Sequence, residues 1–216
     1  MNNLALKLEN VSCERGDRQL FSDLSIEIEA GDIIQVQGPN GSGKTSLLKI
    51  LTGISSDYEG SISWKNQNLQ TALFDFRNNL LFIGHLPAVK RSLTPTENLD
   101  WFIGMSGGFV SGSKPAVIRG ALASVSLQGY EDVPCYTLSA GQMRRVALAR
   151  LYLSRAPVWI LDEPFTAIDI AGVESLRSRM LEHVSGGGVI ILTTHQDLGI
   201  DQVKLLNLLD FMGSGK

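Results

Sequence analysis

The sequence predicts an α/β fold with a mostly parallel central sheet, and three observations support this prediction. Continuous apolar runs at Leu80–Gly84, Val158–Leu161 and Gly188–Thr194 are typical of strands that are covered on both faces. Segments of helix-forming composition lie between such runs, so strands and helices alternate along the chain. Near the start, Leu4–Val11 alternates apolar and polar residues, which predicts half-exposed strands and a separate antiparallel β portion.

The individual elements follow from the same patterns. Alternating strands are expected at 4–11, 24–28 and 60–64, with turns at Gly16-Asp17 and Gly31-Asp32. Apolar strands are expected at 33–37, 80–84, 158–161 and 188–194, and a final strand at 203–209. Helices are expected at 46–51, 95–102, 115–125, 140–154 and 172–184, with a Gly- and Ser-rich loop over 104–112.

Length and composition limit the class of protein. With 216 residues we expect a single domain over 1–216, with a helical subdomain at about 87–154. The net charge of −3 argues against a nucleic-acid partner. Cys13 and Cys135 lack metal-binding spacing and are expected to be reduced, buried thiols. Residues 1–10 lack a signal-peptide pattern, and no apolar run approaches the ~20 residues that span a bilayer, so any membrane role should come through a partner.

A glycine-rich loop between a predicted strand and a predicted helix has the phosphate-binding pattern. It reads Gly38-Pro39-Asn40-Gly41-Ser42-Gly43-Lys44-Thr45. Glycines let backbone N–H groups turn inward around phosphates without a Cβ clash. Lys44 is expected to bind the β/γ-phosphates of a nucleotide and Thr45 to ligate Mg²⁺, and we assign Ser46 to the same site. An ordinary Gly-rich turn is the alternative.

Two carboxylates end the apolar strand at 158–161. Asp162 and Glu163 should project into the crevice where α/β sheets bind ligands. Asp162 is expected to hold Mg²⁺ opposite Thr45, and Glu163 to polarise an attacking water as a general base. A plain surface position is the alternative for such a pair.

The segment Leu138-Ser139-Ala140-Gly141-Gln142 has two interpretations. Ser-x-x-Gln is a capping box that would begin the helix expected at 140–154. A helix N-terminus with a free hydroxyl is also an anion site. One surface can cap the helix and face a γ-phosphate, so both interpretations remain open.

These motifs, followed by Thr166-Ala167-Ile168-Asp169 and His195, occur in the order found in an ABC-type ATPase, which the chain resembles over roughly residues 4–210. The resemblance implies a P-loop NTPase fold with a RecA-like parallel core sheet, an antiparallel β subdomain and a helical subdomain. It also implies a head-to-tail homodimer in which Ser139, Gly141 and Gln142 of one copy cover ATP held by the phosphate loop of the other. Asp169 would communicate across that interface, and His195 would contact the γ-phosphate and the attacking water.

A narrower resemblance is to the ATP-binding subunits of the cytochrome c maturation system, a haem-linked exporter of the bacterial inner membrane. The similar segments are Cys13–Arg18 before Leu20-Phe21, Phe82–His85 with Pro87, Leu93-Thr94 before Glu97-Asn98-Leu99, Asp162–Asp169 and Thr193–Gln196. This resemblance implies integral membrane permease subunits as partners and a peripheral location on the cytoplasmic side of that membrane. An ATPase subunit of another small exporter is one alternative, and a nucleotide-gated clamp with little turnover is another.

Two positions depart from the ABC pattern. The glutamine that usually follows the strand at 80–84 is replaced by Leu86, and no glutamine occurs between Gln70 and Gln128. Leucine offers no ligand atom, so water would take that Mg²⁺ contact. The aromatic residue that usually stacks on adenine is also missing, and Arg15 stands near its place. Arg15 either stacks on the base or is simply solvated.

Overall fold

The structure is a computed structural model that describes residues 4–105, 112–166 and 168–212. Most of the loop expected at 104–112, and Ala167 of the motif at 166–169, lie outside these residues. The chain groups into two compact units. The first comprises Met1–Phe82, Ala156–Glu163 and His183–Lys216, and the second comprises Ile83–Arg155 and Pro164–Glu182.

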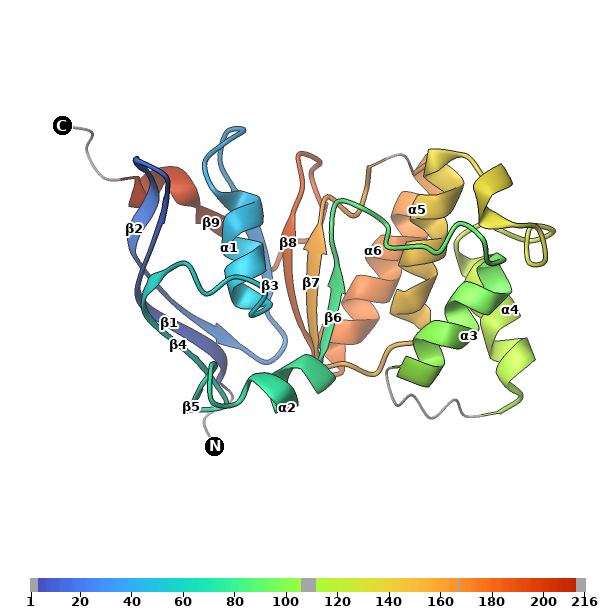
Figure 1. The fold of residues 1–216 in the computed structure, drawn as a ribbon, viewed down its shortest axis with the longest axis horizontal. Coiled ribbons are helices and arrows are strands. Elements are labelled where there is room, and N and C mark those ends of the chain that lie inside the picture. Colours follow the sequence, from blue (N-terminus) through green and yellow to red (C-terminus); the bar gives the residue numbers. More distant parts are fainter. Residues whose placement is uncertain (1–3, 106–111, 167, 213–216) are drawn as a thin grey trace. The chain divides into compact units, whose positions relative to one another are not determined.

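Two sheets form the framework (Figure 1). An antiparallel sheet has the order β2-β1-β4-β5. A second sheet has the order β6-β7-β8-β3-β9, and its pairs β7–β8, β8–β3 and β3–β9 are parallel. The strands are β1 (Leu4–Arg15), β2 (Arg18–Glu29), β3 (Ile33–Gln37), β4 (Glu59–Trp64), β5 (Gln67–Asn68), β6 (Leu80–Ile83), β7 (Val158–Asp162), β8 (Val189–Thr193) and β9 (Val203–Asn207). The predicted α/β class, with a parallel core sheet and an antiparallel portion, is confirmed.

The burial of each strand shows whether it is covered on both faces, as its apolar sequence predicts. Every residue of β7 and β8 is buried, as predicted for strands covered on both faces. The same prediction was wrong for β6, in which Leu80 and Phe82 are only half-buried. The reason is topological, because β6 is an edge strand of its sheet. The last strand ends at Asn207, since the chain there turns into a short 3₁₀ helix whose first turn the Asn207 side chain caps.

The helices are α1 (Lys44–Leu51), α2 (Leu73–Asn78), α3 (Pro95–Met105), α4 (Lys114–Ser124), α5 (Ala140–Ala149) and α6 (Ile170–Ser185), with 3₁₀ turns at Cys135–Thr137, Arg150–Tyr152 and Leu208–Phe211. The helix predicted at 140–154 is therefore shorter, because its last turn tightens to 3₁₀ geometry. Sequence patterns missed α2, a helix of six residues whose Phe76 packs edge-on against Trp64 of β4.

The core of the first unit is shared by its two sheets. Leu47, Leu48, Ile50 and Leu51 give α1 a buried apolar face within this core. Burial of one such side chain contributes about 1.5–3 kcal/mol. The phosphate loop therefore precedes a helix that packing has already fixed in place.

The second unit is helical and contains α3, α4, α5 and most of α6. The Tyr152 hydroxyl lies 2.8 Å from Ser175 Oγ, which donates to the carbonyl oxygen of Ser124. This chain of contacts ties α6 to the end of α4. In the described part of the chain, no helix combines the length and the apolar character needed to cross a membrane.

Candidate functional site

The glycine-rich loop connects β3 to α1 in a conformation that needs its glycines. Gly38, Gly41 and Gly43 have φ of 147°, 81° and 99°. A Cβ built on Gly38 would lie 2.5 Å from Ser42 Oγ, which a real side chain could not occupy. The Ser42 hydroxyl is buried and has no hydrogen-bond partner among the residues described. Because the first turn of α1 leaves its N–H groups unpaired, the loop is an anion-binding cradle.

Lys44 folds over this loop. Its Nζ donates to the carbonyl oxygens of Gly38, at 2.7 Å, and of Pro39, at 3.2 Å. A carbonyl is a weaker partner for an ammonium group than a phosphate oxygen. Lys44 therefore lies close to the loop N–H groups and can replace its two carbonyl contacts with contacts to a bound anion.

Asp162 lies at the end of β7 with the phosphate loop on one side and β8 on the other. Its Oδ2 accepts from Thr45 Oγ1 at 3.3 Å, and its Oδ1 accepts from Thr193 Oγ1 at 2.7 Å. Asp162 as a whole is only 4% exposed. The parallel register that pairs Asp162 with Thr193 creates this contact. The sequence-predicted partners Thr45 and Asp162 are therefore adjacent.

Glu163 follows in a strained conformation. Its φ of 51° is left-handed, which is uncommon for a residue with a side chain and is often found at functional sites. Thr193 stabilises this backbone conformation, because its carbonyl oxygen and its Oγ1 both accept from the Glu163 N–H, at 3.1 and 3.0 Å. Sequence reasoning did not single out Thr193. The sequence feature that could have identified Thr193 is its position two residues before His195, at the end of a buried strand.

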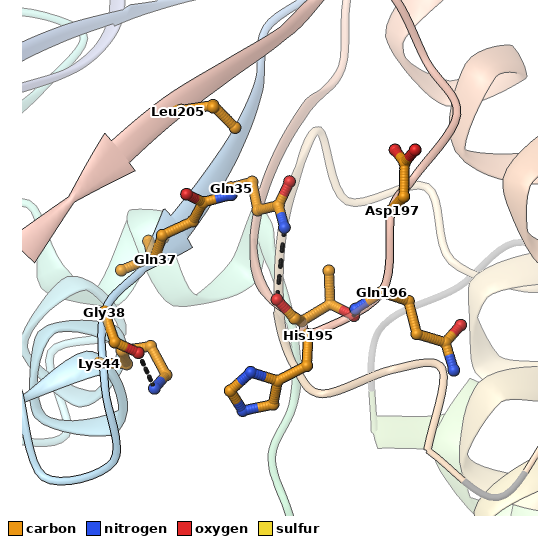
Figure 2. A pocket seen from close by; sticks show the side chains of 10 residues that line it. Gln35, Gln37, Gly38, Lys44, His195, Gln196, Asp197 and Leu205 are labelled. Atoms are coloured by element: carbon orange, nitrogen blue, oxygen red, sulfur yellow. Dashed lines mark hydrogen bonds between the residues drawn. The ribbon is translucent and has the colours of Figure 1, made fainter.

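The same turn directs the Glu163 side chain toward His195. Glu163 Oε1 lies 3.5 Å from His195 Nε2, and the imidazole is 67% exposed while the carboxylate is 20% exposed. In Figure 2 the imidazole extends toward the side on which Lys44 lies. The structure therefore brings together a lysine, a threonine, two carboxylates and a histidine that the sequence places up to 151 positions apart, from residue 44 to residue 195.

A cavity of about 460 Å³ opens beside these groups, and Figure 2 shows its polar lining. Gly38, Lys44 and His195 line it together with Gln37 and Asp197. The Gln35 amide donates to the carbonyl oxygen of Thr194 and so holds the end of β8 against β3. The cavity lies at the carboxyl ends of parallel strands, where α/β proteins bind ligands.

The other predicted residues lie in the second unit. The capping box of α5 is present, because the Gln142 N–H donates to Ser139 Oγ and the Ser139 N–H to Gln142 Oε1. Gly141 lies in the first turn of this helix. Asp169 accepts from the Gly172 N–H and pairs with Arg145 at 2.8 Å. Arg145 is a partner that sequence reasoning did not identify.

The segment after β6 is held by side chains from far along the chain. Arg144 Nη1 donates to the carbonyl oxygen of Gly84 at 2.6 Å, and Arg150 Nη2 to that of Ala88 at 2.7 Å. Both guanidinium groups are buried, and burial lowers the pKa of Arg150. Asn98 exchanges hydrogen bonds with the backbone of Lys90. Between these anchors Leu86 is 78% exposed.

Both cysteines are free and buried, as predicted, and burial raises the pKa of each thiol. Neither lies with a set of His, Cys, Asp or Glu that could hold a metal within the described ranges. Arg15 is exposed and lines a cavity of about 170 Å³ with Ser46 and Lys49 of α1.

Comparison with known proteins gives consistent matches. A family profile described as ABC transporter matches residues 21–166. The protein named "Cytochrome c biogenesis ATP-binding export protein CcmA" from Saccharophagus degradans is 46% identical over 206 residues, which cover 93% of this chain and 92% of that protein. The protein of the same name from Colwellia psychrerythraea is 51% identical over 202 residues, which cover 92% and 90% of the two chains.

A solved structure has the same fold. It is a dimeric ATP-binding cassette in a post-hydrolysis state, bound to ADP and Pi, and it aligns with a TM-score of 0.81 over 94% of each chain. Its sequence identity to this chain is 22%.

Proposed function

Since this chain belongs to the ABC transporter family, we propose that it hydrolyses ATP to drive a membrane-embedded partner in c-type cytochrome maturation, a step linked to haem. The observation that carries the ATPase part is the contact chain Thr45–Asp162–Thr193–Glu163–His195 beside the phosphate loop. The relatives named as cytochrome c biogenesis export proteins support the cellular role.

Each residue has a chemical task in this proposal. The loop N–H groups and Lys44 bind the β/γ-phosphates of ATP. Glu163 accepts the proton of the attacking water. His195, whose Nε2 lies 3.5 Å from Glu163 Oε1, donates to the water or to the γ-phosphate. Thr193 positions both carboxylates, because it contacts the Asp162 side chain and the Glu163 N–H.

Mg²⁺ fits the residues present. Mg²⁺ prefers oxygen ligands, keeps several waters and uses one or two carboxylates with substrate phosphates. Thr45 Oγ1 and Asp162 Oδ2, 3.3 Å apart, offer such a hydroxyl and carboxylate. Bound there, the ion would neutralise charge on the β- and γ-phosphate oxygens.

The proposed active form is a head-to-tail homodimer. Ser139, Gly141 and Gln142 begin α5, and the helix N-terminus can face a γ-phosphate bound by the second copy. Asp169, already oriented by Arg145, would lie at the same interface. A cassette of the same fold is a dimer, which supports a dimeric form of this chain. The partners would be integral permease subunits, with the chain peripheral on the cytoplasmic side of the inner membrane.

A second candidate function is a nucleotide-gated clamp with little turnover. The observation that favours it is the exposed Leu86, where a glutamine would offer a ligand atom. Turnover measured with the membrane partner present separates the two functions, since a clamp would bind ATP without steady hydrolysis.

The cellular role is tested with variants that retain the fold. In cells that make only the Lys44→Ala or Glu163→Gln protein, the complex should assemble while covalently haem-bound c-type cytochromes fail to mature. The b-type cytochromes, which need no covalent attachment, serve as the control. Haem staining of denatured membrane and periplasmic fractions is the measurement. Normal c-type staining with a hydrolysis-dead protein would refute the haem role and leave an ATPase subunit of another exporter.

A further inference from the structure

The hairpin between β1 and β2 carries two arginines directly opposite each other. Arg15 ends β1, Arg18 begins β2, and the register pairs them across the two-residue turn Gly16-Asp17. Like charges directly opposite each other destabilise a sheet. Both side chains are exposed, and neither makes a hydrogen bond or ion pair to any residue in the described ranges. Two unpaired charges therefore share one hairpin end.

The start of β2, next to this hairpin end, packs against the phosphate loop. A Cβ built on Gly43 would lie 3.0 Å from Leu20 Cβ and 3.2 Å from Phe21 Cδ1, so the start of β2 touches the loop. Leu20 and Phe21 are both buried. Two residues earlier, Arg18 reaches the tip of the loop, where a Cβ on Gly41 would lie 3.8 Å from its Nη1. The Arg18 guanidinium thus lies close to Gly41 of the phosphate loop.

The surroundings favour an anion over a protein carboxylate as the partner. Glu14 and Asp17 flank the two arginines in sequence, are exposed, and pair with neither of them. On the other side, Arg15 and Lys49 line the 170 Å³ cavity together with Glu14 and Asp57, so carboxylates already balance the positive charge there, and the side that favours an anion is that of Arg18. A guanidinium presents two parallel N–H groups that match a phosphate group.

We propose that Arg18 is a second cationic contact for the phosphate chain of the nucleotide, and that Arg15 strengthens it by adding positive charge across the hairpin. This inference rests on the proposed nucleotide-binding function and adds a ligand contact that the phosphate-loop motif does not contain. The like-charge repulsion at the hairpin end is relieved when the phosphates bind.

Calorimetry with ADP and with inorganic pyrophosphate tests the proposal, because both carry a diphosphate and only ADP carries a nucleoside. Neither is turned over by the proposed ATPase reaction. In the full chain, Arg18→Gln is expected to weaken binding of both by about tenfold, the value of one charge-assisted hydrogen bond. Arg15→Gln should give a smaller loss for both ligands, and Arg18→Lys should recover part of the affinity.

The matched control is Arg119→Gln, which removes the same charge from an exposed position on α4 in the second unit. It should bind both ligands as the parent does. The nucleotide-free Arg18→Gln protein should melt at or slightly above the parent temperature, because a like-charge pair is removed. Weaker binding then cannot be attributed to unfolding.

Three outcomes would contradict parts of this assignment. If Arg18→Gln binds both ligands as the parent does while Lys44→Ala binds both more weakly, the inference is wrong and the proposed function stands. If only ADP binding weakens, Arg18 contacts the nucleoside and the phosphate assignment is wrong. If the parent chain binds no ADP at all, the proposed function itself is refuted.

Discussion

Two loops that each follow a strand are held in opposite ways. The loop after β3 is shaped by its own glycines, and Thr45 at its end donates to Asp162 of β7. The segment after β6 has no such motif, and its carbonyl oxygens accept from Arg144, Arg150 and Asn98. A loop with unpaired backbone N–H groups can bind an anion. A loop whose carbonyl oxygens accept hydrogen bonds from buried side chains instead keeps one conformation. The first loop is therefore suited to binding a ligand, and the second to keeping the segment after β6 in place.

Removing the proposed base Glu163, which follows the strand that contacts the first loop, should have the largest effect. Glu163→Gln is expected to slow ATP hydrolysis by at least ~10²-fold, because the water loses its general base. ATP binding should remain intact, and an ATP-bound dimer should accumulate. Single-turnover hydrolysis and size-exclusion chromatography with ATP measure the two effects. Near-normal turnover would transfer the base role to another group, with His195 the next candidate.

Removing the charge over the phosphate loop should mainly reduce affinity. Lys44→Ala is expected to weaken ATP binding by about 10–10²-fold, because charge-assisted hydrogen bonds to the phosphates are lost. Calorimetry gives the dissociation constant, and Arg119→Ala, which removes a positive charge from an exposed position on α4, is the control. Unchanged affinity in Lys44→Ala would contradict the phosphate-loop assignment.

The second region should respond in stability and not in affinity. Arg144→Met is expected to lower the free energy of unfolding by about 1–3 kcal/mol, because the Gly84 carbonyl loses its buried donor. A loss of that size lowers the melting temperature of a chain this long by roughly 2–12 °C. Differential scanning calorimetry measures the change, with Arg119→Met as the exposed control. A tenfold loss of ATP affinity in Arg144→Met would show that the two loops are coupled.

Restoring the missing glutamine should have the smallest effect. If an absent ligand at Leu86 limits Mg²⁺ positioning, Leu86→Gln should hydrolyse ATP faster at limiting Mg²⁺. If water already fills that place, the basal rate should stay level and only stimulation by the membrane partner should change. Steady-state rates across a Mg²⁺ titration distinguish these results. Since Leu86 is 78% exposed, a fall in rate would not come from a lost core contact and would contradict both.

The difference between the two loops also explains which features could be predicted. The sequence by itself determined the α/β class, the position of the phosphate loop and the capping box of α5, because each depends on contacts among near neighbours. Glycines at φ > 0 and Ser-x-x-Gln spacing act within a few residues. Likewise, the apolar runs of β7 and β8 predicted their full burial.

Only the tertiary structure decided the rest. The role of Thr193 depends on the β7–β8 register, the half-burial of β6 depends on strand order, and the position of Arg18 near the phosphate loop depends on how β2 packs. Arg144 reaches Gly84 across 60 positions of sequence. These contacts join residues that no local pattern links, because their energies depend on which elements become neighbours after the core has formed.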